Sequence, residues 1–481
     1  MNCEHAPRSP FRSLLGRAPR LSARERVHVG LVVAVIAWGA LAFGAVYPWA
    51  YRPLAATCLA CGAIGLLSPT RRTLPRQVVV ALAALACATL VQQLPLSRAA
   101  LAQISPATVE VLGRYDVLFA AGFIQDHALS IAPARTWTGL ILLACFGTFW
   151  VGLAVSLHDK LIIPVVQCLI GLSAGIAALA IAQMGGATGK VYGFWQPEFA
   201  GAPFGPFVNR NHCAGWLVMS ALVGFGYFSG LLARSMRDRA SSWRARVVWF
   251  STREASRLIL VAAGLIIVTL AVLFSASRSG IASMAVGLTA LVTLRAVRLR
   301  HRAGRVAFLM SISLVVVLCV GWAGSDTLVR RFGTFHDDSL DGRLGAWRDA
   351  MAVARRFPVA GTGLNTFDVS MLFYQTTHVD KIYTAAHNDY LQLAAEGGVL
   401  LAAPILLLVV VTVREVWGRF ADRSDTPVVY WVRAGAASGL LAIAAQEAGD
   451  FSLQMPGNAA LFCVLAAIAL HRSVPISPAR T

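Results

Sequence analysis

The sequence is poor in charged residues, and this sets the class of protein. Of its 481 residues only 14% are charged, whereas 57% are hydrophobic. A soluble enzyme of this length needs more charge to cover its surface with groups that water solvates. The composition therefore excludes an ordinary soluble enzyme and indicates an all-α protein that crosses a membrane many times.

Acidic residues are scarcer than basic ones. The chain has 23 Asp and Glu against 42 Lys and Arg, which gives a formal net charge of +19. Such an excess can mark a nucleic-acid-binding protein. Here most arginines stand in short segments between apolar runs, a pattern typical of membrane proteins. We therefore expect membrane lipids around the chain and no nucleic-acid partner.

Patterns of metal ligands and of disulfides are also missing. The nine cysteines are scattered, mostly inside apolar runs. Cys58-x-x-Cys61 lies in the middle of such a run without a second pair, which is more typical of helix packing than of a metal or redox site. The sequence has no His/Cys cluster, and it has no Asp-x-Asp pair that would hold a metal-bound sugar nucleotide. We expect no metal and no cofactor.

Long apolar runs dominate what is present. A helix needs about 20 apolar residues to cross a bilayer, and we predict twelve spans, of which the second, eighth, tenth and twelfth are short. The predicted spans are 27–47, 52–67, 76–95, 136–157, 161–184, 212–232, 258–275, 280–294, 306–324, 398–413, 428–449 and 457–471.

The arginines orient these spans. Residues 1–26 carry six arginines and lack the pattern of a cleaved signal peptide, so we expect a cytoplasmic basic tail. The predicted organisation continues with transmembrane helices 1–9 (27–324), an outer loop domain containing helices (325–397), transmembrane helices 10–12 (398–471) and a second cytoplasmic tail (472–481). The outer segments with room for chemistry are then 96–135, 185–211 and 325–396.

The most informative polar stretch is Ala386–Leu391, followed by Glu396. It closes the long outer loop where the chain re-enters the membrane, and polar groups at such a boundary are costly unless paired or functional. His387 has an ordinary pKa of about 6.5, which suits a general base, although a histidine that only caps a helix fits equally. Asn388 or Asp389 is expected to start the next helix, and Glu396 to shape the re-entry.

An amphipathic helix is predicted inside the long loop. Leu344, Trp347, Met351 and Ala354 recur at helical spacing, and Arg343 lies off that stripe. A helix of this kind beside a membrane usually lies at the interface. We expect this helix to pack as a lid on the spans. A more specific interpretation is that arginines such as Arg343 also contact a phosphate or a sugar.

Two outer arginines stand at the starts of predicted spans. Arg278 lies in a tight hairpin, and Arg210 lies beside Asn209 and Asn211, either of which suits a helix cap. A helix start presents amides and a positive dipole end, and the planar guanidinium matches phosphate. The alternatives are a snorkelling Arg278 and an Arg210 that is only interfacial.

Two carboxylates mark the outer end of the eleventh predicted span. Glu447 and Asp450 lie there, in Gln446-Glu447-Ala448-Gly449-Asp450. Carboxylates at this depth usually pair. The candidate partners are Arg278 and Arg210, so a structural ion pair is expected.

Together these motifs resemble the O-antigen ligase/polymerase superfamily of bacterial membrane glycosyltransferases. The resemblance covers roughly residues 200–415, and a weaker similarity extends to Phe43–Trp49. It is carried by Gly205–His212, by Ser277-Arg278, by Gly342-Arg343 followed by Trp347, by Pro358-x-x-Gly361-x-Gly363, and by His387-Asn388-x-x-Leu391 with Glu396-x-Gly398.

The resemblance implies a helical GT-C-type fold working on the periplasmic face of the bacterial inner membrane. It implies a glycan donor on undecaprenyl diphosphate, transferred without a metal or a nucleotide sugar to lipid A–core or to a growing glycan. The family's essential histidine maps to His387, its outer arginine to Arg278, and a second arginine to Arg210.

The residues themselves support an inverting mechanism. Arg278, with Arg210 or Arg343, would hold the diphosphate, and His387 would orient or deprotonate the acceptor hydroxyl. A ligase and a polymerase share this chemistry, and the tail Asp450–Pro456 resembles members from exopolysaccharide clusters. The alternative function is a transporter or flippase of lipid-linked glycan. Supporting roles are expected for Asn209, Asn211, Asn388, Glu396, Glu447 and Asp450.

Overall fold

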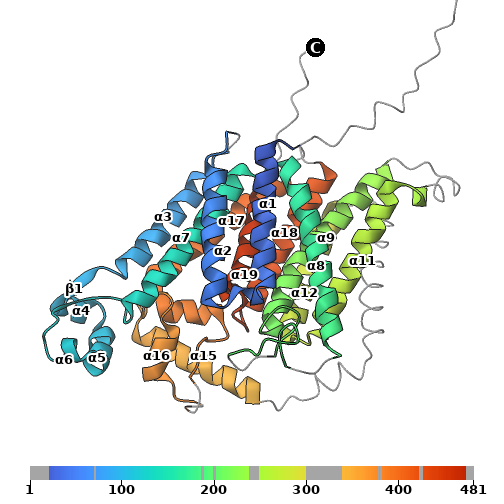
Figure 1. The fold of residues 1–481 in the computed structure, drawn as a ribbon. Helices are drawn as coiled ribbons and strands as arrows, with labels where there is room; N and C mark the ends of the chain where they lie inside the picture. The colour runs from blue at the N-terminus through green and yellow to red at the C-terminus, as the bar shows by residue number, and fades with distance from the viewer. Residues whose placement is uncertain are drawn as a thin grey trace, which may run out of the picture.

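The fold, given by a computed structural model, is a bundle of long helices with short helices at one end and one side (Figure 1). Helix α1 begins and helix α19 ends at the same end of the bundle, opposite α15 and α16. The structure describes residues 21–69, 72–185, 189–198, 202–237, 249–298, 338–377, 379, 382–421 and 426–472.

The long helices follow the predicted spans. Eleven of the twelve predictions coincide with a helix, and the ninth, 306–324, lies outside the described residues. The helices are α1 (Ala23–Leu41), α2 (Pro48–Leu66), α3 (Arg76–Val91), α7 (Pro133–Ser156), α8 (Asp159–Gln183), α9 (Arg210–Arg237), α11 (Arg253–Phe274), α12 (Arg278–Arg298), α17 (Asp389–Ala421), α18 (Pro427–Gln446) and α19 (Pro456–Leu470).

Membrane-spanning character is clearest in part of this set. Among the described helices α7, α8, α9, α11, α17 and α18 are long and apolar enough to cross a membrane, and α3 and α19 are shorter apolar helices. The chain is therefore a multi-pass membrane protein built almost entirely of helices. The total of twelve spans and the GT-C-type arrangement stay predictions.

Short elements fill the segment between α3 and α7. They are an antiparallel pair of strands, β1 (Pro95–Ser97) and β2 (Asp126–Ala128), and three short helices, α4 (Arg98–Ile104), α5 (Pro106–Tyr115) and α6 (Val117–Ala120). These helices project to one side of the bundle (Figure 1). Segment 96–135, which the sequence predicts to lie outside the membrane, is thus a small folded subdomain.

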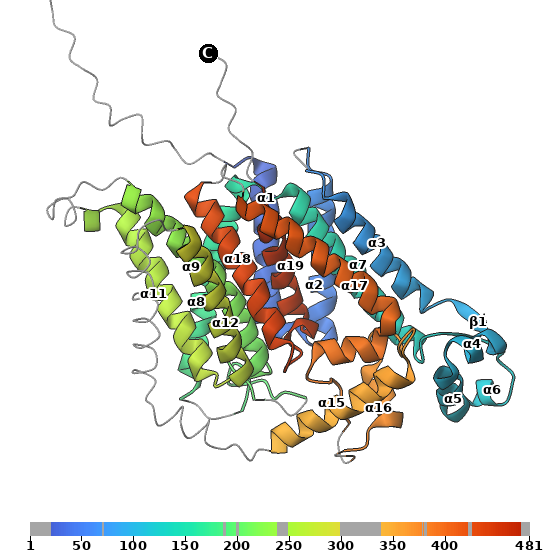
Figure 2. The ribbon, with the colours of Figure 1, turned by 180° about the vertical axis from the view of Figure 1, so that it is seen from behind.

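Helix α15 (Asp338–Arg356) and helix α16 (Phe367–Tyr374) lie across the end of the bundle (Figure 2). The predicted amphipathic helix is confirmed, but its buried face differs from the predicted stripe. Ala346, Ala350 and Val353 are fully buried, whereas Leu344 is 52% exposed and Met351 39% exposed. Small residues let α15 approach its neighbours closely, so the larger apolar side chains are left facing outward.

Helix α17 bends where it leaves this end of the bundle. Gly398 has φ +52°, and a Cβ there would lie 2.7 Å from the carbonyl oxygen of Pro358. The bend releases two amide groups from the helix ladder. Val399 N–H donates to the Pro358 carbonyl and Leu400 N–H donates to the Val359 carbonyl, each at 2.9 Å. The bend therefore ties the turn after α15 to the start of the membrane-spanning part of α17.

Helices α9 and α18 pack backbone against backbone. Gly226 of α9 faces Gly435 of α18, and a Cβ on Gly435 would overlap the Leu222 carbonyl oxygen and lie 2.9 Å from the Val223 Cα. Small residues at a helix crossing in a membrane allow this close approach, and van der Waals contact then stabilises the pair. Because α9 begins and α18 ends at the candidate site, this contact fixes the distance between two of its walls.

Gly435→Ala is expected to lower the melting temperature of the detergent-purified protein, because the added methyl group forces α9 and α18 apart. Overpacking of this kind typically costs about 1–3 kcal/mol. The matched control is Gly171→Ala on α8, where a Cβ meets nothing within 4 Å. Equal melting temperatures for the two variants, measured by tryptophan fluorescence, would show that the crossing tolerates a side chain.

Candidate active site

Five segments that are distant in the sequence meet at the end of the bundle that carries α15. They are the first turn of α9, the first turn of α12, the loop 447–455 after α18, the segment 382–388 before α17, and α15 itself. Hydrogen bonds connect α12, α15 and segment 382–388 to the loop 447–455, and α15 also bonds to segment 382–388. Helix α9 contacts the same loop through His212, 3.7 Å from Asp450. The sequence-predicted residues His387, Arg343, Arg210 and Arg278 each belong to one of these segments.

His387 lies in a strained and partly buried position. Its φ is +51°, in the left-handed region that non-glycine residues rarely adopt. Its carbonyl accepts a hydrogen bond of 3.3 Å from the Trp347 indole of α15, and its ring meets the Phe451 ring edge to face at 4.8 Å. Strain held by surrounding contacts is common at functional sites. The motif residue Trp347 thus serves to hold the histidine backbone.

The imidazole of His387 is kept neutral. Burial lowers its pKa below the ordinary 6.5, the positive charge of Arg343 lowers it further, and Asp450 opposes both. The Nδ1 atom is buried and forms no hydrogen bond with any residue that the structure describes. A neutral imidazole with one nitrogen unused by the protein can accept a proton.

Asn388 and Asp389 begin helix α17, as predicted. The Asn388 carbonyl oxygen accepts from Leu391 N–H at 3.1 Å, while its amide donates to the Ala448 carbonyl at 2.9 Å. Asp389 N–H donates to the Glu447 carbonyl at 3.0 Å. One residue therefore caps α17 and also fastens it to the loop that follows α18.

Asp450 and Phe451 connect His387 to a second histidine. The Asp450 carboxylate is fully buried and lies 3.7 Å from His212 Nε2. The Phe451 ring lies edge to face against His212 at 4.7 Å as well as against His387. The structure thus places His212 beside the Asp450 carboxylate, and the ion pair with Arg278 or Arg210 that the sequence indicates stays a prediction.

The expected site includes neither His212 nor Phe451. His212 follows the predicted cap by one turn, and Phe451 follows Asp450 directly, so the sequence already places both beside residues of the predicted site. The missing information is tertiary, because only the fold brings α9 and the loop after α18 onto the same side of His387.

Arg278 is the first residue of α12, and its neighbours anchor it. The Ser279 hydroxyl donates to Asp450 at 3.0 Å, and the Ser277 hydroxyl accepts from Gly280 N–H at 3.1 Å as a helix cap. Ala276 has φ +48°, so the hairpin turns sharply just before the arginine. Arg278 therefore lies at the start of α12, next to Ser279, whose hydroxyl is bonded to Asp450.

Arg210 is the first residue of α9, and Asn209 rather than Asn211 caps that helix. The Asn209 side chain accepts from Asn211 N–H at 2.8 Å, and the Arg210 amide donates to the Ala202 carbonyl at 2.8 Å. The Asn211 carbonyl accepts from the Gln446 side chain at 3.0 Å. The starts of α9 and α12 thus both face the loop after α18, each with an arginine in its first turn.

Arg343 reaches the same loop from α15. Its guanidinium donates to the Gly449 carbonyl at 3.3 Å, between Glu447 and Asp450 in sequence. The Glu447 carboxyl is buried, and burial together with the neighbouring Asp389 carboxyl raises its pKa. Glu447 directly follows the last residue of α18, and its raised pKa favours the protonated, uncharged carboxyl. The site accordingly combines several arginines with a buried carboxyl group.

Glu396 organises the backbone next to the site. Its carboxylate accepts from Asn365 N–H at 2.7 Å and from Phe367 N–H at 3.1 Å, which caps α16. Its carbonyl accepts from Gly363 N–H at 2.9 Å. Glu396 is 5% exposed and contacts the protein rather than a substrate path. The predicted supporting role therefore takes the form of a cap that joins the turn after α15 to α17.

Metal ligands do not gather at this site. Within the described ranges, no group of three or more His, Cys, Asp or Glu is close enough to hold a metal ion. The groups that are available are imidazoles, guanidinium groups and helix N-termini. Their chemistry suits proton transfer from a hydroxyl and binding of a phosphate-bearing substrate.

Comparison with known protein families gives a match to part of this chain. A family model described as O-antigen ligase matches residues 263–406, which include Arg278, Arg343, His387 and Glu396. Arg210, Glu447 and Asp450 lie outside the match. A search of the curated proteins finds no match. The chain is therefore a multi-pass membrane protein that carries, over residues 263–406, the domain of an O-antigen ligase family enzyme.

Proposed function

We propose that the protein is an inverting glycosyltransferase that moves a glycan from undecaprenyl diphosphate to an acceptor hydroxyl at the periplasmic face of the bacterial inner membrane. The observation that carries this proposal is the meeting of His387 with the arginine-bearing starts of α9 and α12 around the loop after α18. The family match supports membrane glycan transfer of the O-antigen ligase or polymerase type.

The arginines are proposed to hold the donor diphosphate. Arg278 and Arg210 each combine a guanidinium with a helix N-terminus, and Arg343 adds a third positive group from α15. Positive groups fixed in place before the reaction stabilise charge that develops on a leaving group. The diphosphate leaves with the electron pair of the broken bond between the anomeric carbon and oxygen, and these arginines offset its charge.

His387 is proposed to be the general base. As the acceptor oxygen bonds to the anomeric carbon, its proton passes to the neutral imidazole, and a single displacement inverts that carbon. The lowered pKa supports this role, because a histidine that was already protonated would have no site for the proton. Release of the proton to solvent then restores the enzyme.

The assignment to the periplasmic face rests on charge distribution. The arginine-rich segments 234–257 and 295–305 adjoin the ends of helices remote from the site, and α1 begins at that same remote end. Excess Arg and Lys marks cytoplasmic loops. With this orientation the site faces the periplasm, where lipid-linked glycans are polymerised or ligated.

His387→Asn is expected to abolish transfer while the protein stays folded in the membrane. Asparagine tolerates the left-handed backbone at this position but cannot act as a base, and loss of a general base costs roughly 100-fold or more in rate. The measurement is glycan transfer in proteoliposomes with purified lipid-linked donor, and His127→Asn, in the side subdomain, is the control. Near-normal transfer by His387→Asn would remove the histidine from the mechanism.

The rate should fall at low pH as His387 becomes protonated. Because burial and Arg343 lower its pKa, the acid limb of kcat/KM is expected below pH 6.5. Arg343→Gln removes a positive neighbour, so the pKa of His387 should rise and the limb should move to higher pH. The control is Arg348→Gln, an exposed arginine on the same helix. If the acid limbs of Arg343→Gln and Arg348→Gln lie at the same pH, Arg343 does not lower the pKa of His387.

Ligase and polymerase activities can be separated in the host cell. We expect a polymerase, because the tail Asp450–Pro456 resembles members from exopolysaccharide clusters. Deletion of the gene should then leave single glycan repeats in place of long polymers on glycan gels. Loss of polymer from lipid A with intact lipid-linked polymer would instead identify a ligase. A strain that carries the His387→Asn variant serves as a control with the protein still present.

A further inference from the structure

The subdomain between α3 and α7 carries an uncharged apolar segment at residues 117–124, which comprise α6 and the turn after it. Val117 is 79% exposed, Leu118 is 54% exposed and Phe123 is 81% exposed. The Phe123 N–H donates to the Leu118 carbonyl at 2.9 Å, so the turn brings these residues together. We call Val117, Leu118 and Phe123 the apolar tip. Exposed apolar side chains gathered in this way mark an interaction surface.

The backbone amides of this segment already have partners inside it. The Asp116 carboxylate accepts from Leu118 N–H at 3.0 Å and from Phe119 N–H at 3.1 Å. Each N–H group of residues 120–124 donates to a carbonyl of residues 116–119. A segment that enters apolar surroundings must satisfy its amides internally, because lipid offers them no partner. The tip therefore meets a condition for contact with lipid that ordinary exposed loops need not meet.

The buried side of the segment is fixed to membrane helices. Phe119 is fully buried and forms a small core with Leu101 and Leu112. This core also packs against Val91 at the end of α3 and Leu400 next to the bend of α17. Figure 1 shows the short helices α4, α5 and α6 beside the end of α3. The tip is thus attached where α3 ends and where α17 begins its membrane-spanning part.

The exposed apolar surface of α3 and α7 continues to this subdomain. Leu90 and Leu94 lead from α3 into β1, and Trp137 and Ile141 lie in the first turns of α7; all four are exposed. Helix α7 is long and apolar enough to cross a membrane, so lipid covers its exposed side chains. Tryptophan is typical of the level of the lipid headgroups. Both chain connections of the subdomain therefore lie at the membrane boundary.

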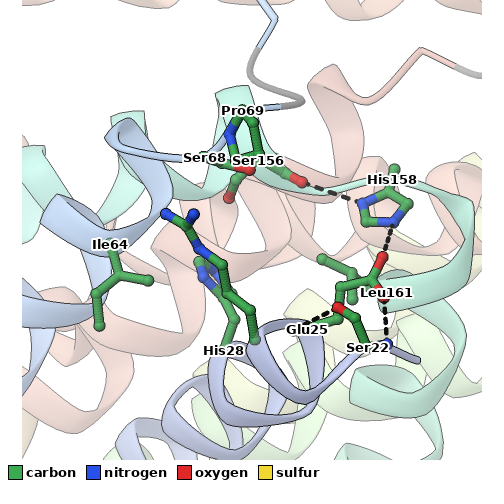
Figure 3. Close-up of a pocket in the computed structure, with 10 residues that line it drawn as sticks. Ser22, Glu25, His28, Ile64, Ser68, Pro69, Ser156, His158 and Leu161 are labelled. Carbon is green, nitrogen blue, oxygen red and sulfur yellow. Dashed lines mark hydrogen bonds and ion pairs between the residues drawn. The ribbon is translucent and has the colours of Figure 1, made fainter.

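The opposite end of the bundle offers a contrast. There a cavity lies between the start of α1 and the segment before α8, and polar side chains line much of it (Figure 3). His158 Nε2 contacts the Glu25 carboxylate at 3.0 Å, and Glu25 also completes the cap of α1 with Ser22. Polar contacts join the helix ends in that region, whereas the tip presents apolar side chains.

We propose that the apolar tip inserts into the bilayer leaflet at the end of the bundle that carries the candidate active site. Val117, Leu118 and Phe123 would lie between the headgroups and the acyl chains. The segment has no charged side chain, so its insertion removes no ion from water. Shallow insertion of an apolar face is a common way for a non-spanning element to bind a bilayer.

Insertion would connect the bilayer to the lid of the site, because the same subdomain holds α15 and α16. The Tyr115 ring packs against Phe373 of α16 at 5.9 Å, and Glu110 accepts a hydrogen bond from Arg356 of α15. An inserted tip therefore keeps α15, which holds the candidate base, at a fixed height above the membrane surface. This consequence rests on the proposed function, whereas insertion itself does not.

The test places the photoreactive residue p-benzoylphenylalanine at Phe123 of the full-length protein and irradiates isolated membranes of the expressing cells. The comparison position is Arg114 on α5, whose side chain is 65% exposed and pairs with Glu110. Mass spectrometry of the purified protein identifies what each position has captured. Insertion predicts lipid adducts that are several-fold more abundant at Phe123 than at Arg114.

A pair of charge variants tests whether these adducts depend on the tip. Val117→Asp places a negative charge in the tip, so it is expected to lower the yield of lipid adducts at Phe123 several-fold. Gly113→Asp is the matched control, because it adds the same charge at an exposed position of α5 where a Cβ meets nothing within 4 Å. The control is expected to leave the yield unchanged.

Three outcomes would overturn the proposal. The first is an equal yield of lipid adducts at Phe123 and Arg114. The second is capture of a second copy of the chain, or of another protein, at Phe123 in place of lipid. The third is an equal loss of adducts in Val117→Asp and Gly113→Asp, once size-exclusion profiles show that both are folded. The readout needs no glycan transfer, so failure of the proposed function would not alter it.

Discussion

The hydrogen bonds between the start of α17 and the loop after α18 are the contact on which the candidate active site depends. Asp389 N–H and the Asn388 side chain bond to the carbonyls of Glu447 and Ala448. Helix starts and loops have backbone groups without partners in their own segment, and near a membrane these must be satisfied inside the protein. Joining two such segments satisfies both, and it places His387 against Phe451.

A second constraint, the bend of α17 at Gly398, makes that contact possible. A straight α17 would carry Asp389 along the line of its membrane-spanning part. The bend lets the residues before Gly398 run beneath the bundle, where Glu396 caps α16 and Gln392 bonds to Gln454 at 3.2 Å. The amides freed at the bend bond to Pro358 and Val359, so the turn after α15 is fixed too. One glycine conformation thus links α15, α16 and α17.

Sequence predicted the helices well because apolar runs are a local signal. It also predicted that Asn209 or Asn211 caps α9 and that Asn388 or Asp389 begins α17, since capping depends on neighbours within one turn. The structure selects Asn209 and Asn388 as the capping residues. It did not show that His212 and Phe451 lie beside His387, or that α15 buries Ala346 and Ala350 instead of Leu344 and Met351. Those outcomes depend on which helices meet and how closely, and periodicity within one helix carries no information about its partner.

The arrangement of charge explains how one site can hold both a base and several cations. Arg343 makes His387 a weaker base in the empty enzyme, which keeps it neutral. In the proposed reaction the donor diphosphate brings negative charge to the same arginines and offsets their effect on the imidazole. The proton affinity of His387 therefore rises when the donor binds, because opposite charge nearby favours the protonated form. The arginines that hold the leaving group thereby also tune the base.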